Sequence, residues 1–221
     1  PEFETRMQQI HQAIAAGDFY QVNYTSNMHG EMTGDSASLF KAMHQAQPNA
    51  YAAFIQNEYE EVLSVSPELF FELKQGHILV RPMKGTASRG VDPQDDELKK
   101  MQLQQSAKEQ AENVMIVDLI RNDLSRIAKP HSVKVNQLFN IQTLPTLFQM
   151  VSDVEADLQD NLGVADVMQA LFPCGSITGA PKVMAMKMIH QIEPEERGVY
   201  CGTVGVIRPG GDATFNAVSY T

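Results

Sequence analysis

The chain is poor in cysteine and in positive charge, and it contains no long apolar run. Its two cysteines, Cys174 and Cys201, are too few for a disulfide framework and too far apart to suggest a metal site, so we expect a reducing, cytoplasmic setting. The 27 acidic residues outnumber the 17 lysines and arginines, and the net charge of −10 argues against nucleic acid and anionic membrane as partners. No apolar run reaches transmembrane length, and no signal peptide is visible. An anionic small molecule stays compatible, because its site needs positive charge only locally.

Common catalytic patterns are also missing. No Ser-His-Asp or Cys-His arrangement can be assigned, and the six histidines are scattered without ligand spacing, which is typical of surface or core positions. What is present is ordinary for a globular protein with a real core, with 43% hydrophobic and 20% charged residues. The 221 residues fit one large domain or two small ones. Because the sequence starts without methionine and stops inside an apparent strand, we expect a fragment of a longer protein.

Hydrophobic periodicity predicts mixed helices and strands that do not alternate regularly, which favours an α+β fold over a doubly wound one. Residues 86–96 are predicted to form a loop over a site, and residues 173–179 a turn. We expect helices over residues 3–17, 36–45, 95–127 with a break near Ser106, 164–171 and 181–189. We expect strands over residues 18–32, 51–56, 61–66, 69–74, 77–81, 133–140, 146–154, 199–208 and 213–220.

One lysine stands at the end of a predicted strand, in the stretch Arg81-Pro82-Met83-Lys84-Gly85-Thr86. Proline fixes the backbone there, and glycine allows a sharp turn. If the Lys84 ammonium is partly desolvated, its neutral form is favoured and becomes a usable nucleophile. On this stretch alone, an exposed turn lysine is the more common outcome.

Carboxylates that could carry chemistry occur at two places. Glu109 and Glu112 lie three residues apart on the long predicted helix, so they share a face, and paired carboxylates suit Mg²⁺. A solvated acidic face paired with Lys108 is the alternative. Glu68 precedes an apolar run, where its charged form would be disfavoured and it could act as a general acid near neutral pH. An exposed turn glutamate is the alternative there.

A turn rich in glycine and hydroxyl groups, Gly175 to Lys182, precedes the last predicted helix. Backbone N–H groups at such a helix start bind carboxylate or phosphate oxygens, and Lys182 adds positive charge. The spacing is not that of a Walker loop, and a tight turn capped by Thr178 explains the stretch equally well. On the long helix, Asp118 and Asn122 are one turn apart, and Asp118 and Arg121 can form a local ion pair. Apolar residues surround these groups, which indicates a structural network more than direct catalysis.

Taken together, these stretches are more specific than any one of them. In chain order they are Gly17-Asp18-Phe19-Tyr20-Gln21-Val22-Asn23, Ser66-Pro67-Glu68-Leu69-Phe70, Pro82-Met83-Lys84-Gly85-Thr86, Glu112 to Asp123, Gly175 to Lys182, and Arg197-Gly198-Val199-Tyr200-Cys201-Gly202. In these motifs the chain resembles the chorismate-utilising enzymes, over nearly its whole length. With lysine at position 84, the chain resembles the aminodeoxychorismate (para-aminobenzoate) branch of the family, because the anthranilate and salicylate branches usually have alanine at that position. Gln21 points the same way, since the water-activating enzymes carry lysine at that place.

The resemblance implies an α+β fold of antiparallel β-sheets stacked face to face with helices outside. It implies one chorismate-binding catalytic domain over residues 1–221, incomplete at the C-terminus. The reaction implied is that of the aminodeoxychorismate branch. Chorismate and ammonia, supplied by a glutamine amidotransferase subunit, give 4-amino-4-deoxychorismate for para-aminobenzoate and folate biosynthesis.

The resemblance also implies roles for individual residues. Lys84 attacks C2 of the ring, and the C4 hydroxyl leaves with a proton from the general acid Glu68. Ammonia then attacks C4 and expels the lysine. Glu112, with Glu109 beside it, matches a Mg²⁺ ligand. Positions that match the chorismate site or adjoin it are Gln21, Thr86, Thr178, Gly179, Lys182, Tyr200 and Gly202.

Three features depart from the family pattern. Gln149 stands where the family often has histidine, and Tyr220 where it usually has an arginine that grips a substrate carboxylate. The sequence also stops before a second glutamate pair that completes the Mg²⁺ site, so we expect this chain as given to be impaired or inactive, although its parent would be an enzyme. The alternatives are an anthranilate-forming enzyme, which Lys84 disfavours, a chorismate- or amidotransferase-binding module without turnover, and an unrelated Schiff-base lysine enzyme.

Overall fold

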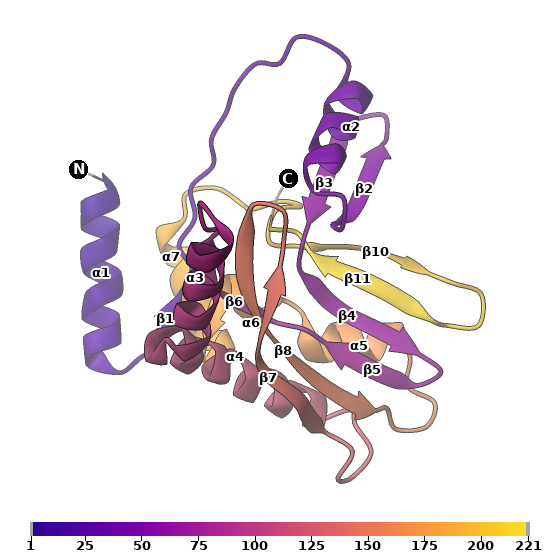
Figure 1. Ribbon diagram of the computed structural model, residues 1–221. Coiled ribbons are helices and arrows are strands. Elements are labelled where there is room, and N and C mark those ends of the chain that lie inside the picture. Colours follow the sequence, from indigo (N-terminus) through magenta and orange to yellow (C-terminus); the bar gives the residue numbers. More distant parts are fainter. Residues whose placement is uncertain (1, 220–221) are drawn as a thin grey trace.

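The computed structural model describes residues 2–219, in which helices and strands are mixed (Figure 1). Every pairing between strands of this part is antiparallel, so the predicted α+β class with antiparallel sheets is confirmed. The helices are α1 (Glu2–Ala16), α2 (Ser36–Ala46), α3 (Pro93–Gln105), α4 (Ala107–Ser125), α5 (Val164–Leu171), α6 (Gly175–Thr178) and α7 (Lys182–Ile192). The strands are β1 (Gln21–Val22), β2 (Tyr51–Gln56), β3 (Glu61–Ser66), β4 (Leu69–Lys74), β5 (His77–Val80), β6 (Met83–Ser88), β7 (Lys134–Thr143), β8 (Leu147–Asp157), β9 (Gly179–Ala180), β10 (Thr203–Ile207) and β11 (Ala213–Ala217).

The largest sheet runs in the order β10-β11-β4-β5-β8-β6, and β7 pairs with β8. Strand β8 is long enough to pair with β5 along its second half, where Val80 lies opposite Val154, and with β6 along its first half, where Thr86 lies opposite Gln149. Strands β5 and β6 therefore lie in line along the same side of β8, with a break at Arg81 and Pro82. Lys84 stands in β6, two residues beyond the proline.

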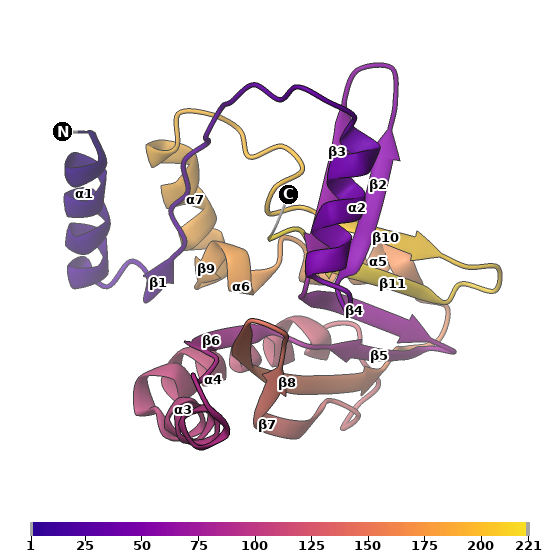
Figure 2. The ribbon, with the colours of Figure 1, turned by 45° about the horizontal axis from the view of Figure 1, so that its top comes forward.

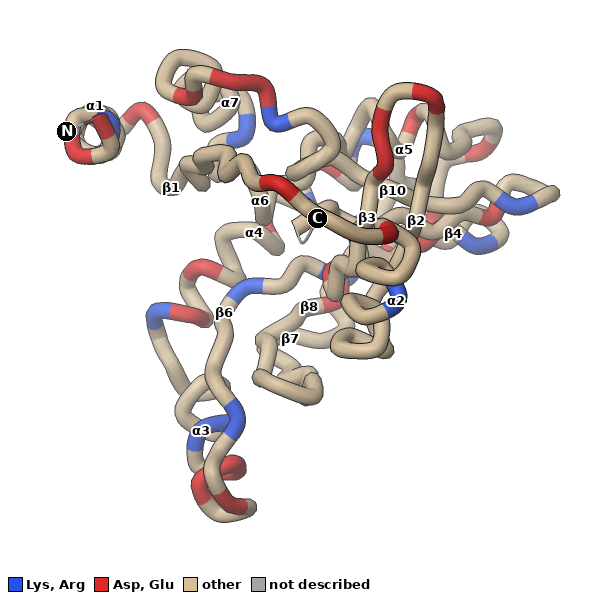
Figure 3. Tube along the Cα trace, turned by 90° about the horizontal axis from the view of Figure 1, so that it is seen from above, with Lys and Arg blue, Asp and Glu red and all other residues tan. Residues whose placement is uncertain are grey.

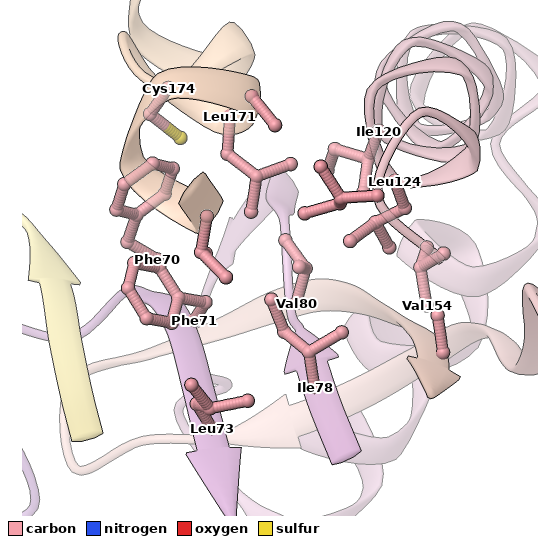
Figure 4. Close-up of a cluster of buried hydrophobic side chains, with 14 of the residues drawn as sticks. Phe70, Phe71, Leu73, Ile78, Val80, Ile120, Leu124, Val154, Leu171 and Cys174 are labelled. Carbon is pink, nitrogen blue, oxygen red and sulfur yellow. The ribbon is translucent and has the colours of Figure 1, made fainter. Parts of the chain in front are cut away.

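The core lies between this sheet and the helices on one of its faces. Side chains of β4, β5 and β8 pack against α4, α5 and the segment that leads into α6, and Figure 4 shows Ile120 and Leu124 of α4 facing Val80 and Val154. Burial of such side chains is the main stabilising term of the fold. Helix α2 packs on the β2–β3 hairpin, which leads into β4 (Figure 2).

Acidic residues outnumber basic ones, and both kinds are spread over the molecule. Seen from above in Figure 3, acidic segments are spread over helices and hairpins, and basic segments are interspersed among them. Within residues 2–219, no helix combines the length and the apolar character that crossing a membrane requires.

Most predicted elements are confirmed, including the break at Ser106. That residue ends α3 and caps α4, because its hydroxyl accepts a hydrogen bond from the N–H of Glu109 at 3.4 Å. Several predictions were wrong in extent or type, and the strand predicted over residues 199–208 begins only at Thr203. The predicted loop over residues 86–96 is shorter, since β6 runs to Ser88 and α3 begins at Pro93. The predicted strand over residues 18–32 is reduced to β1.

The helix of residues 175–178 replaces most of the turn predicted at residues 173–179. Its last carbonyls are bonded by groups from distant parts of the chain. Asn23 donates its side-chain amide to Ser176 O at 2.6 Å and its N–H to Thr178 O at 2.8 Å, and Arg197 donates to Ile177 O at 2.9 Å. These bonds explain why β1 ends early: Asn23 bonds to α6, and Thr25 donates its N–H to Glu193 at 2.9 Å, so neither pairs with a neighbouring strand.

Candidate active site

Lys84 and Glu68 meet where β4 and β6 begin. Glu68 is 6% exposed, and its carboxyl accepts hydrogen bonds from the Ser176 hydroxyl at 2.5 Å and from the backbone N–H of Met83. Burial raises the pKa of Glu68 to about 7, although the Ser176 bond, the Lys84 charge and the Met83 bond all oppose the rise. A carboxyl with that pKa is partly protonated at neutral pH and can donate a proton to a leaving group.

Gly85 brings the strand that carries Lys84 against α4. The pairing of β6 with β8 shifts register between Met83 and Thr86, and Gly85 has a φ of +98° in this irregular stretch. A Cβ on Gly85 would lie 3.1 Å from Oε2 of Glu109. The glycine thus makes a bulge in a strand, where the sequence predicted a sharp turn. As a consequence, half-buried Lys84 stands between a buried acid and the acidic start of α4.

Glu109 and Glu112 share a face of α4, as their spacing predicts. The exposed Nζ of Lys108 lies 3.5 Å from Glu109 and 3.7 Å from Glu112, so the pairing weighed as the alternative is present. Across the residues that the structure describes, no group of three or more histidine, cysteine, aspartate or glutamate side chains could hold a metal. Two carboxylates nevertheless fit Mg²⁺, which takes one or two and keeps several waters.

Strands β1 and β9 bring together three residues that the sequence predicted near a substrate. Gln21 lies opposite Ala180, directly beside Gly179, and a Cβ on Gly179 would lie 2.2 Å from the carbonyl oxygen of Gln21. Only glycine fits such an approach, and its φ of +143° is also rare for other residues. Buried Thr178 donates its hydroxyl to Cys174 O at 2.9 Å, and Oε1 of Gln21 is buried without a partner among the described atoms.

Lys182 does not occupy the place that the sequence predicted. Its ammonium donates to Oδ2 of Asp123 and to the carbonyl of Leu171, both at 2.6 Å, and the ion pair is largely buried. Arg126 also contacts Asp123, at 3.0 Å. The Lys182 side chain therefore ties α7 to α4 and α5, in place of the predicted substrate contact. The ion pair predicted between Asp118 and Arg121 is present at 2.8 Å, but it is exposed, so the buried network lies at Asp123 instead.

Tyr200 and Gly202 lie in the segment between α7 and β10. Together with Thr178 they line a hollow of about 590 Å³, which Lys84 and Glu68 do not line. Gly202 donates its N–H to Val199 O at 2.9 Å, and a Cβ there would lie 2.7 Å from that oxygen, so the tight turn requires glycine. The structure thus separates the predicted site residues into a Lys84–Glu68 group and a Thr178–Tyr200 group joined through α6.

Thr86 pairs directly with the residue that departs from the family pattern. Its hydroxyl donates to Oε1 of Gln149 at 3.0 Å, and Gln149 is buried. A glutamine at this position therefore fixes the orientation of Thr86, two residues from Lys84. Tyr220, the other departure, lies outside the described residues.

Sequence reasoning missed three residues that organise the site. Ser176 bonds the carboxyl of Glu68, and Asn23 and Arg197 hold α6 from behind. Each lies in a motif that the sequence singles out, but its role depends on partners distant in sequence, for which sequence spacing has no signal. The separation is 108 positions for Ser176, 153 for Asn23 and 20 for the bond from Arg197 to α6.

Comparison with known proteins shows which family the chain is similar to. It matches the family described as chorismate binding enzyme over residues 1–219. Aminodeoxychorismate synthase component 1 of Klebsiella aerogenes is 43% identical over 206 residues, which are 93% of this chain and 46% of that protein. The protein of the same name from Bacillus subtilis (strain 168) is 36% identical over 219 residues, 99% of this chain and 47% of that protein. Anthranilate synthase component 1 of Aquifex aeolicus is 35% identical over 206 residues, 93% of this chain and 42% of that protein.

A solved structure agrees with this placement. Anthranilate synthase component I from Streptococcus pneumoniae TIGR4 superposes with a TM-score of 0.90 at 28% identity, over 98% of this chain and 48% of that one. The chain spans about half the length of the relatives it matches. On these grounds, the chain belongs to the chorismate binding enzyme family.

Proposed function

We propose that this chain is a catalytic part of an aminodeoxychorismate synthase component 1. The observation that carries the proposal is a lysine in β6 beside a buried carboxyl whose pKa is raised to about 7 by burial. A nucleophile with an acid close enough to feel its charge is what displacement of a ring hydroxyl needs, because hydroxide is a poor leaving group. Similarity adds support, since relatives with this name are 36–43% identical to the chain.

The proposed reaction has two displacements. Lys84, as the neutral amine, attacks C2 of chorismate, both ring double bonds shift by one position, and the bond between C4 and its oxygen breaks. Glu68 gives its proton to that oxygen, which leaves as water. Ammonia then attacks C4, the two double bonds shift back, and the bond between C2 and Lys84 breaks, which frees the lysine as the neutral amine. The new ammonium group at C4 loses one proton, which restores the acid form of Glu68. The sum exchanges a hydroxyl for an amino group and yields 4-amino-4-deoxychorismate and water.

Glu109 and Glu112 are the residues we propose for holding Mg²⁺. Lys108 is exposed and pairs with them only at 3.5–3.7 Å, so it can move aside at little free-energy cost. A cation bound there would supply positive charge for a substrate carboxylate. Gly85 keeps this pair of carboxylates beside the strand of Lys84, since any larger residue would press on Glu109.

The proposal includes a partner and a setting. The words "component 1" in the names of the relatives support a second subunit, and we propose that it is a glutamine amidotransferase that supplies ammonia. Both cysteines are free and buried, which supports a reducing, cytoplasmic location.

Mass spectrometry tests the proposal. The full-length protein that contains this chain is incubated with chorismate and Mg²⁺ without ammonia. We expect an adduct of chorismate minus water on the peptide that carries Lys84. Lys84→Ala should abolish the adduct, and Lys134→Ala, which removes an exposed lysine of strand β7, should retain it. An adduct that survives Lys84→Ala, or none in the unchanged protein, refutes the lysine mechanism.

A second candidate is the anthranilate-forming reaction, favoured by the TM-score of 0.90 with anthranilate synthase component I. Chromatography of the products formed with chorismate, ammonium and Mg²⁺ separates the two. Anthranilate as the main product would replace our proposal, whereas 4-amino-4-deoxychorismate would support it.

A further inference from the structure

A chain of three buried polar side chains runs from the acid into the core. The Ser176 hydroxyl is 2.5 Å from Oε1 of Glu68, and the Cys174 thiol is 3.0 Å from the same hydroxyl. The residues Glu68, Ser176 and Cys174 are 6%, 4% and 6% exposed, so solvent does not replace these contacts. Neither Ser176 nor Cys174 has a part in the reaction steps proposed above.

A buried carboxyl that gives up and regains a proton needs a neighbour suited to both forms. The carboxylate needs a donor, and the acid needs an acceptor. A hydroxyl can act as either, and a thiol is a weak donor and a weak acceptor. A buried polar group without a partner is destabilising, so the second partner of the hydroxyl matters.

We propose that Ser176 and Cys174 are positioning residues, which form a reversible hydrogen-bond relay that holds the Glu68 carboxyl in one orientation in both of its protonation states. With the carboxylate, the thiol donates to the Ser176 oxygen and the hydroxyl donates to Oε1. With the acid, Glu68 donates to the Ser176 oxygen and the hydroxyl turns to donate to sulfur. Every proton stays on its own heavy atom, and only the hydroxyl and thiol hydrogens rotate.

The surroundings of the relay suit this task. Burial raises the pKa of the Cys174 thiol to about 12, so the thiol stays neutral and does not compete for the proton. The charged groups that act on the relay are Lys84 from β6, on the side of Glu68, and Lys182 from α7, on the side of Cys174. Because Asn23 bonds the backbone carbonyl of Ser176, the Ser176 oxygen is held in place while its hydrogen is free to turn.

The catalytic meaning of the relay rests on the proposed function, but the relay can be measured without substrate. The side-chain carboxyl of Glu68 is titrated by ¹³C NMR in the chain labelled at glutamate, and Glu68→Gln identifies its signal. Ser176→Ala removes a donor to the charged form, so the pKa of Glu68 should rise by about one unit. Cys174→Ala removes a weak thiol donor from the Ser176 oxygen in the charged form and removes the acceptor of the Ser176 hydroxyl in the acid form. A buried donor without an acceptor is costlier than a hydroxyl oxygen that still donates but accepts one bond fewer, so the acid form loses more and the pKa of Glu68 should fall.

Shifts of opposite sign in the pKa of Glu68 in the two alanine variants distinguish a relay from general structural damage. Cys174→Ser, which keeps a donor and an acceptor, should restore the original titration. Ser64→Ala removes another buried serine hydroxyl, one that has no partner among the described atoms, and should leave Glu68 unchanged. If Ser176→Ala fails to fold, the downward shift in Cys174→Ala alone decides. Equal titrations, or shifts of the same sign in both alanine variants, overturn the relay.

The outcome separates the relay from the proposed function. In the full-length enzyme, the pH profile of kcat should move in the same directions as the two titrations, whereas simple structural damage would lower kcat at every pH. If the titrations shift as expected but no adduct forms on Lys84, the proposed function fails and the relay stands. If the adduct forms but neither titration shifts, the relay alone fails.

Discussion

Replacing Glu68 by glutamine should change how the stability of the protein depends on pH. Burial raises the pKa of Glu68 from 4.5 to about 7, so between these values the folded state holds a proton that the unfolded state has released. The resulting stabilisation is fully present below the unfolded pKa and is lost as pH rises through the folded one. Each unit is about 1.4 kcal/mol, so the full difference is about 3 kcal/mol.

The assay is urea unfolding of both proteins at intervals from pH 4.5 to pH 8. The free energy of unfolding of the native protein, relative to Glu68→Gln, should fall by about 3 kcal/mol across that interval. Groups that titrate equally in both proteins cancel in the difference. Parallel curves would show that Glu68 has an ordinary pKa, and a native protein that gains stability at high pH would show that Lys84 and Ser176 outweigh burial. Either result would remove the case for Glu68 as an acid near neutral pH.

Three further outcomes are expected. Gly179→Ala should lower the free energy of unfolding by about 3 kcal/mol or more, because the new Cβ would lie 2.2 Å from a carbonyl oxygen and the residue has a φ of +143°. The control is Gly163→Ala, whose Cβ would meet open space and which should change the free energy of unfolding by less than about 1 kcal/mol. Scanning calorimetry of both variants measures the difference. Lys182→Met should lower the free energy of unfolding by up to about 3–5 kcal/mol, because buried Asp123 then keeps only the exposed Arg126 as a partner. Adding Asp123→Asn should recover part of this loss, and a double variant no more stable than the single one contradicts the pairing. Glu112→Gln should weaken Mg²⁺ binding about tenfold or more in isothermal calorimetry of the full-length protein, and unchanged affinity would place the ion elsewhere.

Local patterns in the sequence predict the elements well. The serine at position 106 is both the expected helix break and the observed cap of α4, because capping depends on side chains within three residues. Gln75 and Gly76 form the hairpin turn predicted between β4 and β5, with φ values of 51° and 79°. These predictions succeed because the deciding contacts are local.

The failures have non-local causes. The glycine at position 85 is consistent with a turn, but pairing with β8 makes it a strand bulge. Lys182 looks like a free cation beside a glycine-rich turn, and only the folded chain shows Asp123 at 2.6 Å from it. Glu68 is predicted as an acid from its apolar neighbours, yet the hydroxyl that bonds it comes from residue 176, a separation of 108 positions.

The bonds that hold α6 also bear on the order of folding. Asn23 reaches Ser176 across 153 positions of sequence, and Arg197 reaches Asn23 across 174. Closing loops of that length loses chain entropy before any contact forms, and folds dominated by such contacts form slowly. The acid at Glu68 should therefore gain its hydroxyl partner late, after the sheet and α4 have assembled. In hydrogen exchange, the amides of α6 should open with those of β1, as one cooperative unit distinct from the sheet.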